Sequence, residues 1–282
     1  MTLRHAADAA TQGKPRIDVA KVQRWGAWYV VEHQLRVLRN YRGTLIATTI
    51  GTPFIYLFAF GVGLATLVSQ NLGDTGVDGV SYLAFVAPAL ICTAAVTVAT
   101  SEFTYPIMLG FKWNPYFIGM NSAPLTARQI MDGQVIFVTL RMILTAVFYF
   151  AVMLVFGAVP SEFGIGSAVA AVLAGLSFGT PLLAYSSSVT EDKGQFAVIM
   201  RVVLLPLTLF SGTIFPLSQL PIFLQWIGWI SPLWHGTMLA RQFSYGATEP
   251  IWLTVIHVVY LLALAIGGWM LAVRIATRRL DK

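Results

Sequence analysis

The chain has 282 residues, of which 57% are hydrophobic and only 11% are charged. A soluble domain of ordinary composition cannot hide that much apolar surface, so a soluble globular protein is excluded and lipid is expected as the main solvent. The formal net charge of +6 would suit a nucleic-acid partner, but the basic residues form no groove-like cluster and we expect no nucleic-acid binding. The single cysteine, Cys92, excludes an internal disulfide and a multi-cysteine metal site.

Long uncharged stretches predict six membrane-spanning helices, because a charged side chain at the bilayer centre costs about 2.5–3.5 kcal/mol on insertion scales. Each stretch can supply the ~20 residues that cross a hydrocarbon core of ~30 Å. The third lies between Arg141 and Glu162. The other five are predicted near Thr44–Val68, Tyr82–Gly110, Ile165–Ser187, Ala197–Phe215 and Trp252–Val273. The predicted fold class is therefore an all-α integral membrane protein.

The uncharged stretch between Arg201 and Arg241 is too long for a single span, so the chain must turn within it. Its second half is interrupted by Pro216, Pro221 and Pro232. Each proline removes a backbone donor and disfavours helix in the residue before it. We expect Leu217–His235 to form short apolar helices that dip into the outer face and return, within a re-entrant segment 216–240 between spans five and six.

The basic residues predict the orientation of the chain. Of the 18 lysines and arginines, all except Arg241 lie on one predicted side of the membrane. They fall in the two terminal segments, in the loops that follow spans two and four, or early in the spans after those loops. Because lysine and arginine collect in cytoplasmic loops, both termini are expected in the cytoplasm. No cleavable apolar signal region precedes span one, which is expected to act as the targeting element. The predicted divisions are a flexible cytoplasmic start 1–20, an interfacial helix 21–43, a six-span domain 44–273 and a basic cytoplasmic tail 274–282.

The segment before span one combines aromatic and basic residues. Trp25 and Trp28 precede Arg36 and Arg39, with aliphatic residues between them. This pattern favours an amphipathic helix lying in the plane of the membrane interface. The alternative is a basic flank that only sets the topology.

The second cytoplasmic loop, 111–133, is long for a simple turn between spans. We expect either a compact helical knob or an ordinary amphipathic connector, and Thr126 is a candidate for the start of the next helix. The loop includes Lys112, Trp113, Asn114, Pro115, Tyr116, Ser122, Pro124, Leu125 and Arg128.

The sequence lacks the motifs of an enzyme. It has no glycine-rich phosphate loop, so any ATP must be hydrolysed by another subunit, and its four histidines lack the spacing of a helical zinc site. Neither a charged relay across the bilayer nor a selectivity filter is recognisable, which disfavours a secondary carrier or a channel, the alternative function. Glu102, near the cytoplasmic end of span two, is either functional, paired with Arg141 or Arg201, or snorkelling to the headgroups.

Several motifs together carry a family resemblance. They are the interfacial segment Trp25–Arg39, Glu102-Phe103-Thr104-Tyr105, the loop Ser122–Arg128, Phe210-Ser211-Gly212-Thr213-Ile214-Phe215-Pro216-Leu217, and Ser231-Pro232-Leu233-Trp234-His235 followed by Arg241. In this order, over nearly the whole chain past residue 20, they resemble the permease subunits of ABC exporters for nodulation-type lipo-oligosaccharides, polysaccharides and daunorubicin-type drugs.

The resemblance implies a transport subunit of a bacterial plasma membrane that is not itself an enzyme. It implies a dimer, expected as a homodimer of this chain, together with two copies of a separate cytoplasmic ATPase that bind ATP and Mg. It also implies an amphipathic or lipid-linked substrate. It assigns ATPase coupling to the loop 111–133, with the nine residues from Lys112 to Arg128 named above as candidates for contact with the ATPase. It assigns a connecting role to the interfacial helix. The intramembrane or gate candidates are Glu102, Tyr105, Phe210, Phe215, Pro216, Trp234 and His235.

Overall fold

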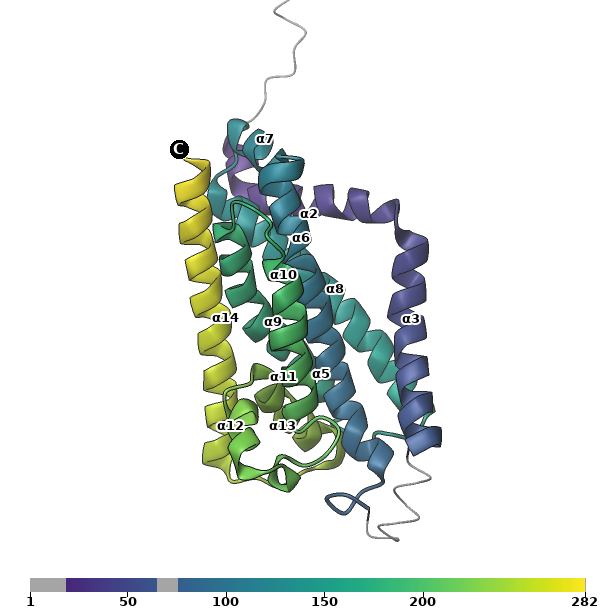
Figure 1. Cartoon of the computed structure of the whole chain (residues 1–282). Helices are drawn as coiled ribbons and strands as arrows, with labels where there is room; N and C mark the ends of the chain where they lie inside the picture. The colour runs from purple at the N-terminus through teal and green to yellow at the C-terminus, as the bar shows by residue number, and fades with distance from the viewer. Residues whose placement is uncertain (1–18, 65–75, 282) are drawn as a thin grey trace, which may run out of the picture.

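A computed structural model describes residues 19–64 and 76–281 (Figure 1). Within these ranges the regular structure is helical, apart from one isolated β-bridge between Val77 and Val80. The all-α prediction is thus confirmed for the described part of the chain. The predicted flexible start lies outside it, except for residues 19 and 20, as does the predicted end of the first span.

Five helical segments are long and apolar enough to cross a membrane: Val22–Gly61, Tyr82–Trp113, Ala127–Val155, Gly166–Ser188 and Ile251–Leu280. The predicted fifth span coincides with a shorter apolar helix, Gln195–Phe210. At ~1.5 Å per residue this helix covers roughly 24 Å, less than a hydrocarbon core of ~30 Å. The membrane-spanning character is clear, whereas the count of six spans stays a prediction.

Helix α2 (Val19–Arg39) crosses one end of the bundle, and α3 (Arg42–Phe58) then turns along the bundle axis and continues as the π-helical turn η1 (Ala59–Leu64) (Figure 1). Val30 of α2 is fully buried. Helix α2 is held against α8 (Ala127–Val155), where a Cβ on Gly133 would lie 2.5 Å from the Cβ of Val30. A glycine is therefore needed for this close approach.

Helix α5 (Tyr82–Glu102) forms the centre of the bundle and begins at Ser81, whose Oγ accepts a hydrogen bond from the amide of Ala84. It breaks at Phe103–Thr104 and continues as α6 (Tyr105–Met108) and the π-helical turn η3 (Leu109–Trp113). The short helix α7 (Tyr116–Ser122) follows. Helix α8 then begins at Ala127, inside the predicted loop 111–133, because Thr126 and Gln129 form a reciprocal capping box.

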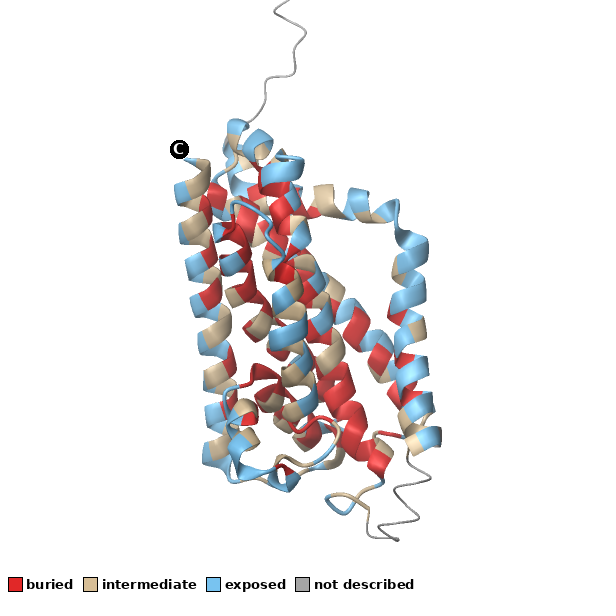
Figure 2. Cartoon of the chain, viewed as in Figure 1, coloured by how far each residue is buried: buried red, intermediate tan, exposed pale blue. Residues whose placement is uncertain are grey.

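Helix α9 (Gly166–Ser188) packs closely against α14 (Ile251–Leu280) and against α5, and α9 and α5 carry more buried residues than α14 does (Figure 2). Small residues allow this approach: the Oγ of Ser177 donates to the carbonyl of Leu261 at 2.9 Å, and Gly268 faces the backbone at Pro181. Hydroxyls and glycines at such contacts are typical of helices that pack in lipid, where apolar surface alone gives no driving force.

Short helices occupy the end of the bundle opposite the one that α2 crosses. The segment α10 (Gln195–Val198), η4 (Ile199–Leu204) and α11 (Leu205–Phe210) leads to η5 (Leu217–Gln219), α12 (Ile222–Trp229) and α13 (Pro232–Tyr245). Pro221 and Pro232 stand at the starts of α12 and α13, as their lack of a backbone donor favours. Helix α13 runs beyond the predicted boundary at residue 240 to Tyr245, and Gly246 caps it with φ 75°.

Candidate functional site

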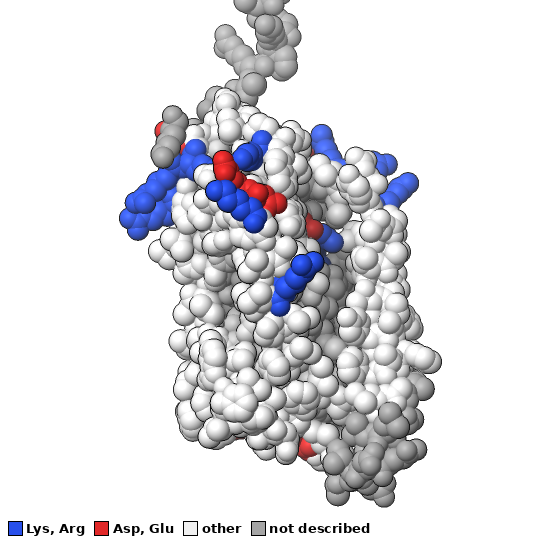
Figure 3. All heavy atoms as spheres, viewed as in Figure 1, with Lys and Arg blue, Asp and Glu red and all other residues white. Residues whose placement is uncertain are grey.

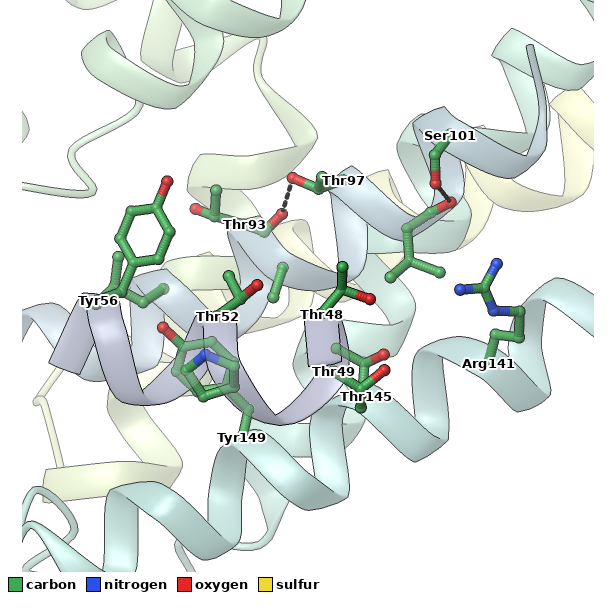
Figure 4. Close-up of a pocket in the computed structure, with 14 residues that line it drawn as sticks. Thr48, Thr49, Thr52, Tyr56, Thr93, Thr97, Ser101, Arg141, Thr145 and Tyr149 are labelled. Carbon is green, nitrogen blue, oxygen red and sulfur yellow. Dashed lines mark hydrogen bonds between the residues drawn. The ribbon is translucent and has the colours of Figure 1, made fainter. Parts of the chain in front are cut away.

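A groove with a cavity volume of about 360 Å³ lies between α3, α5 and α8 (Figure 4). Its lining is unusual for helices in lipid because hydroxyl groups from all three helices face it. These are Thr48, Thr49, Thr52 and Tyr56 of α3, Thr93, Thr97 and Ser101 of α5, and Thr145 and Tyr149 of α8. Apolar residues such as Pro53 and Leu90 complete the wall.

Four of the nine hydroxyl groups that line the groove donate to carbonyls of their own helices. Thr48 donates to the carbonyl of Thr44 at 2.9 Å, Thr93 to Ala89 at 2.8 Å and Thr97 to Thr93 at 2.8 Å, and Ser101 donates to Val98 at 2.9 Å. This bonding to the preceding turn satisfies each donor without a partner helix. The hydroxyl oxygens keep free lone pairs, so the groove offers a row of hydrogen-bond acceptors to a ligand that carries donors.

A second chamber of about 450 Å³ continues the groove toward α2 and α7, and the two share Thr48 and Arg141 in their walls. It is lined by His33 and Gln34 of α2, by Asn114 and by Tyr116, the first residue of α7. Gln34 donates a hydrogen bond to the Tyr116 hydroxyl at 3.2 Å. Burial raises the pKa of Tyr116, so this hydroxyl stays protonated at neutral pH.

An ion pair joins α5 to α8 where the two chambers meet. The Nη1 of Arg141 donates to the Oε1 of Glu102, and the two side chains are only 17% and 19% exposed. The Nε of Arg141 is buried and has no hydrogen-bond partner in the described part of the chain. Of the alternatives weighed for Glu102, the pairing with Arg141 is the one found. A charged pair with one donor still unused is suited to exchange partners with a polar ligand.

The predicted coupling residues gather at the end of the bundle that carries the lysines and arginines (Figure 3). The members of the set that are exposed there are Lys112, Trp113, Asn114, Pro115, Ser122, Pro124 and Arg128, while Tyr116 and Leu125 are half-buried. Phe117 anchors the knob formed by η3 and α7, packing edge-to-face on Phe111 with ring centroids 5.0 Å apart. The Nδ2 of Asn121 donates to the carbonyl of Leu280 at 3.2 Å, which ties the knob to α14.

The predicted interfacial residues lie on α2 at the same end. Trp25 and Trp28 are half-exposed, and Arg36 pairs with Glu32 at 2.6 Å on the helix surface. Tyr105 stacks on Trp113 with centroids 6.2 Å apart. It belongs to the region next to the knob and does not line the groove.

The remaining gate candidates lie at the opposite end and do not meet Glu102. Phe210 ends α11, and Phe215 and Pro216 follow it. Trp234 and His235 lie in the first turn of α13. This end is held by Arg241, which the sequence reading did not single out as a contact residue. Its fully buried guanidinium donates to the carbonyl of Gly212 at 2.8 Å and lies 3.7 Å from the ring centroid of Phe85.

The groove hydroxyls were missed by sequence reasoning, although a signal exists. Thr44, Thr48 and Thr52 recur every four residues, as do Thr93, Thr97 and Ser101. Residues four apart lie on one face of a helix, so these two rows predict polar stripes on spans one and two.

Fold and groove together define a multi-pass helical membrane protein with a polar path between its helices. The profile of the ABC-2 type transporter family matches residues 28–245. The chain belongs to this family, whose members normally pair with an ATPase subunit.

Curated relatives agree with this assignment. The chain is 27% identical to nodulation protein J of Rhizobium leguminosarum bv. viciae over 248 residues, which covers 86% of this chain and 92% of the relative. It is 26% identical to nodulation protein J of Rhizobium meliloti, covering 86% and 91%. It is 25% identical over 211 residues to the inner membrane transport permease YadH of Escherichia coli, covering 75% and 78%.

Proposed function

We propose that this chain is the membrane-spanning permease subunit of an ATP-driven exporter in a bacterial inner membrane. The cargo is an amphipathic or lipid-linked molecule, such as a glycolipid, lipo-oligosaccharide, polysaccharide or hydrophobic drug. The observation that carries this proposal is the hydroxyl-lined groove between α3, α5 and α8, joined at the Glu102–Arg141 pair to a second polar chamber. A polar path flanked by apolar helix surfaces suits a molecule with one polar and one apolar part.

The proposed topology has six spans, with Gln195–Phe210 as the fifth, and places both termini in the cytoplasm. The segment η5, α12 and α13 is then re-entrant from the outer face. The distribution of lysine and arginine over the two ends of the bundle supports this orientation (Figure 3). Apolar residues exposed on α12, including Ile222, Phe223 and Trp226, support contact with lipid or with a partner subunit.

A separate ATPase, present in two copies with ATP and Mg, supplies the energy, and a second copy of this chain completes the permease. The proposed contact for the ATPase is the knob formed by η3 and α7. Tyr116 of the knob accepts a hydrogen bond from Gln34 of α2, and Asn121 links the knob to the carboxyl end of α14. A push on the knob is therefore passed to α2, which borders the second chamber, as expected for a rigid-body rearrangement between two packed states.

The test is co-purification of the chain with the product of the nearest ATPase gene, followed by measurement of ATP hydrolysis in lipid nanodiscs. We compare Trp113→Ala, which removes an exposed ring from the knob, with the matched control Trp252→Ala at the opposite end. Loss of ATPase capture or of hydrolysis in Trp113→Ala, with both retained in the control, is the expected result. If no ATPase associates in detergent or in lipid, the exporter role is refuted.

A further inference from the structure

Three ionisable side chains at the end opposite the basic residues form one hydrogen-bonded row. The Nε2 of His257, in α14, lies 3.2 Å from the Oε2 of Glu249, and its Nδ1 lies 2.6 Å from the Nδ1 of His235 in α13. The Nε2 of His235 lies 3.0 Å from the carbonyl oxygen of Trp229, at the end of α12. We name these three contacts the latch, because they join α12 and α13 to the start of α14.

The latch is shielded from solvent. His257 is fully buried, His235 is 5% exposed, and the Glu249 side chain is 10% exposed. Trp234 packs edge-on against both imidazoles, with ring centroids 4.9 and 5.0 Å away. Water therefore has little access to replace a missing hydrogen bond. Two acceptor atoms that face each other here without a proton between them destabilise the contact.

Counting protons fixes the charge that the latch requires. Each of its three contacts needs one proton between the two heavy atoms. Two neutral imidazoles and a carboxylate carry only two protons, so they leave one contact as a repulsive pair of acceptors. The row is complete when one further proton is bound, with His257 protonated on both nitrogens, His235 protonated on Nε2 and Glu249 ionised.

The surroundings of Glu249 favour this arrangement. Burial raises the pKa of Glu249, but its hydrogen bond to His257 and the charge of that imidazole, a hydrogen bond from Gln242 and the charge of Arg241 together bring the pKa below its ordinary value. The Nε2 of Gln242 donates to the Oε2 of Glu249 at 2.8 Å. The carboxylate is thus present to receive the proton held by His257.

Few other charges face the latch. Helices α9 and α12 carry no charged residue. Those of α8 lie between its start and its midpoint, at Arg128, Asp132 and Arg141, and the arginines of α14 lie in its last two turns. The titratable neighbours from the surrounding elements are Tyr82 of α5, Arg241 and Tyr245 of α13, Tyr260 of α14, and Asp78, which accepts from Tyr245 at 3.4 Å. The net charge of the latch is therefore decided mainly by its own three side chains.

We propose that the Glu249–His257–His235 row is a proton-operated latch, which closes the α12–α13 segment onto α14 when it holds one bound proton. The closed latch binds one more proton than the open one, so raising the pH weakens closure and lowering the pH strengthens it. One proton changes the equilibrium by about tenfold per pH unit. Imidazoles ordinarily titrate between about pH 5 and 8, which sets the range of the test. The inference does not depend on the ATP-driven role.

The experiment measures amide hydrogen exchange in the full chain, in lipid nanodiscs, across pH 5.5–8.5 after correction for the intrinsic pH dependence of exchange. The observed region is 226–245, which contains the end of α12 and the whole of α13. For the unmodified chain, protection is expected to fall by up to about tenfold per pH unit as the proton is lost. The same protection at every pH overturns the proposal.

The decisive variant is Glu249→Gln. A glutamine amide supplies the missing proton to the Nε2 of His257 while both imidazoles stay neutral, and a rotated Gln242 amide accepts its other hydrogen. The latch is then complete at every pH, so protection should be high and independent of pH. The matched control is Glu162→Gln, which removes a carboxylate from another loop at the same end and should keep the pH dependence. An unchanged pH dependence in Glu249→Gln, or its loss in the control, overturns the proposal.

Discussion

Replacing Glu102 by glutamine tests the ion pair at the junction of the two chambers. The change removes the charge that faces Arg141 while keeping the shape of the side chain. Two unit charges ~4 Å apart attract by about 4 kcal/mol at an effective dielectric of 20, and breaking a fully buried pair costs about 3–5 kcal/mol. Because the two side chains are 17% and 19% exposed, water screens part of this, and we expect a coupling energy of about 2–3 kcal/mol.

The assay is a double-mutant cycle with Glu102→Gln, Arg141→Met and the double variant, each unfolded reversibly in mixed micelles. The single variants should each lose stability, and the double variant should lose less than the sum of the two. Glu162→Gln serves as the control for loss of a carboxylate on the surface and should change the free energy of unfolding by less than about 0.5 kcal/mol. A coupling energy below about 0.5 kcal/mol would show that the pair behaves as an exposed surface pair and refute the reasoning.

Three further predictions concern stability and use the same unfolding assay. Gly133→Ala places a Cβ against Val30 and should destabilise the fold by about 1–3 kcal/mol, because it pushes α2 away from α8. The control Gly119→Ala meets nothing within 4 Å and should be neutral or stabilising. Equal effects of the two variants would contradict this packing. Thr126→Ala removes the capping box of α8 and should cost about 1 kcal/mol; no loss would mean that the cap contributes nothing. Arg241→Met leaves the Gly212 carbonyl without its donor and should cost about 1–3 kcal/mol; an unchanged stability would count against Arg241 as the tie between these segments.

The sequence predicts the helices well where the physical signal is strong. Charge gaps locate the apolar helices, because a charge in lipid is costly, and the prolines locate the starts of α12 and α13. The start of α8 was harder to predict from the sequence. Arg141 marks the edge of an uncharged stretch, whereas the helix begins 14 residues earlier, at Ala127, because capping and not hydrophobicity decides where it starts.

The site was less predictable than the fold. Glu102 stood out as a charge in an apolar stretch, but its choice of Arg141 over Arg201 depends on how α5 crosses α8, which a single sequence does not encode locally. The contact between His235 and His257 has the same origin, since it joins residues on different helices. The threonine rows of α3 and α5 were readable in principle from their four-residue spacing, yet only packing shows that they face one another across a groove.

The most direct test of the central claim is whether the groove changes shape when the partner ATPase works. Cys92 is the single cysteine of the chain, so Cys92→Ala allows a lone reporter to be placed at Thr97→Cys in the groove, or at Val169→Cys on the exposed surface of α9 as a control. The rate of thiol labelling is measured in the assembled complex with and without ATP and vanadate. The account predicts a nucleotide-dependent rate at position 97 and a constant rate at position 169. Equal rates at position 97 in all nucleotide states would contradict the groove as the path that ATP hydrolysis drives.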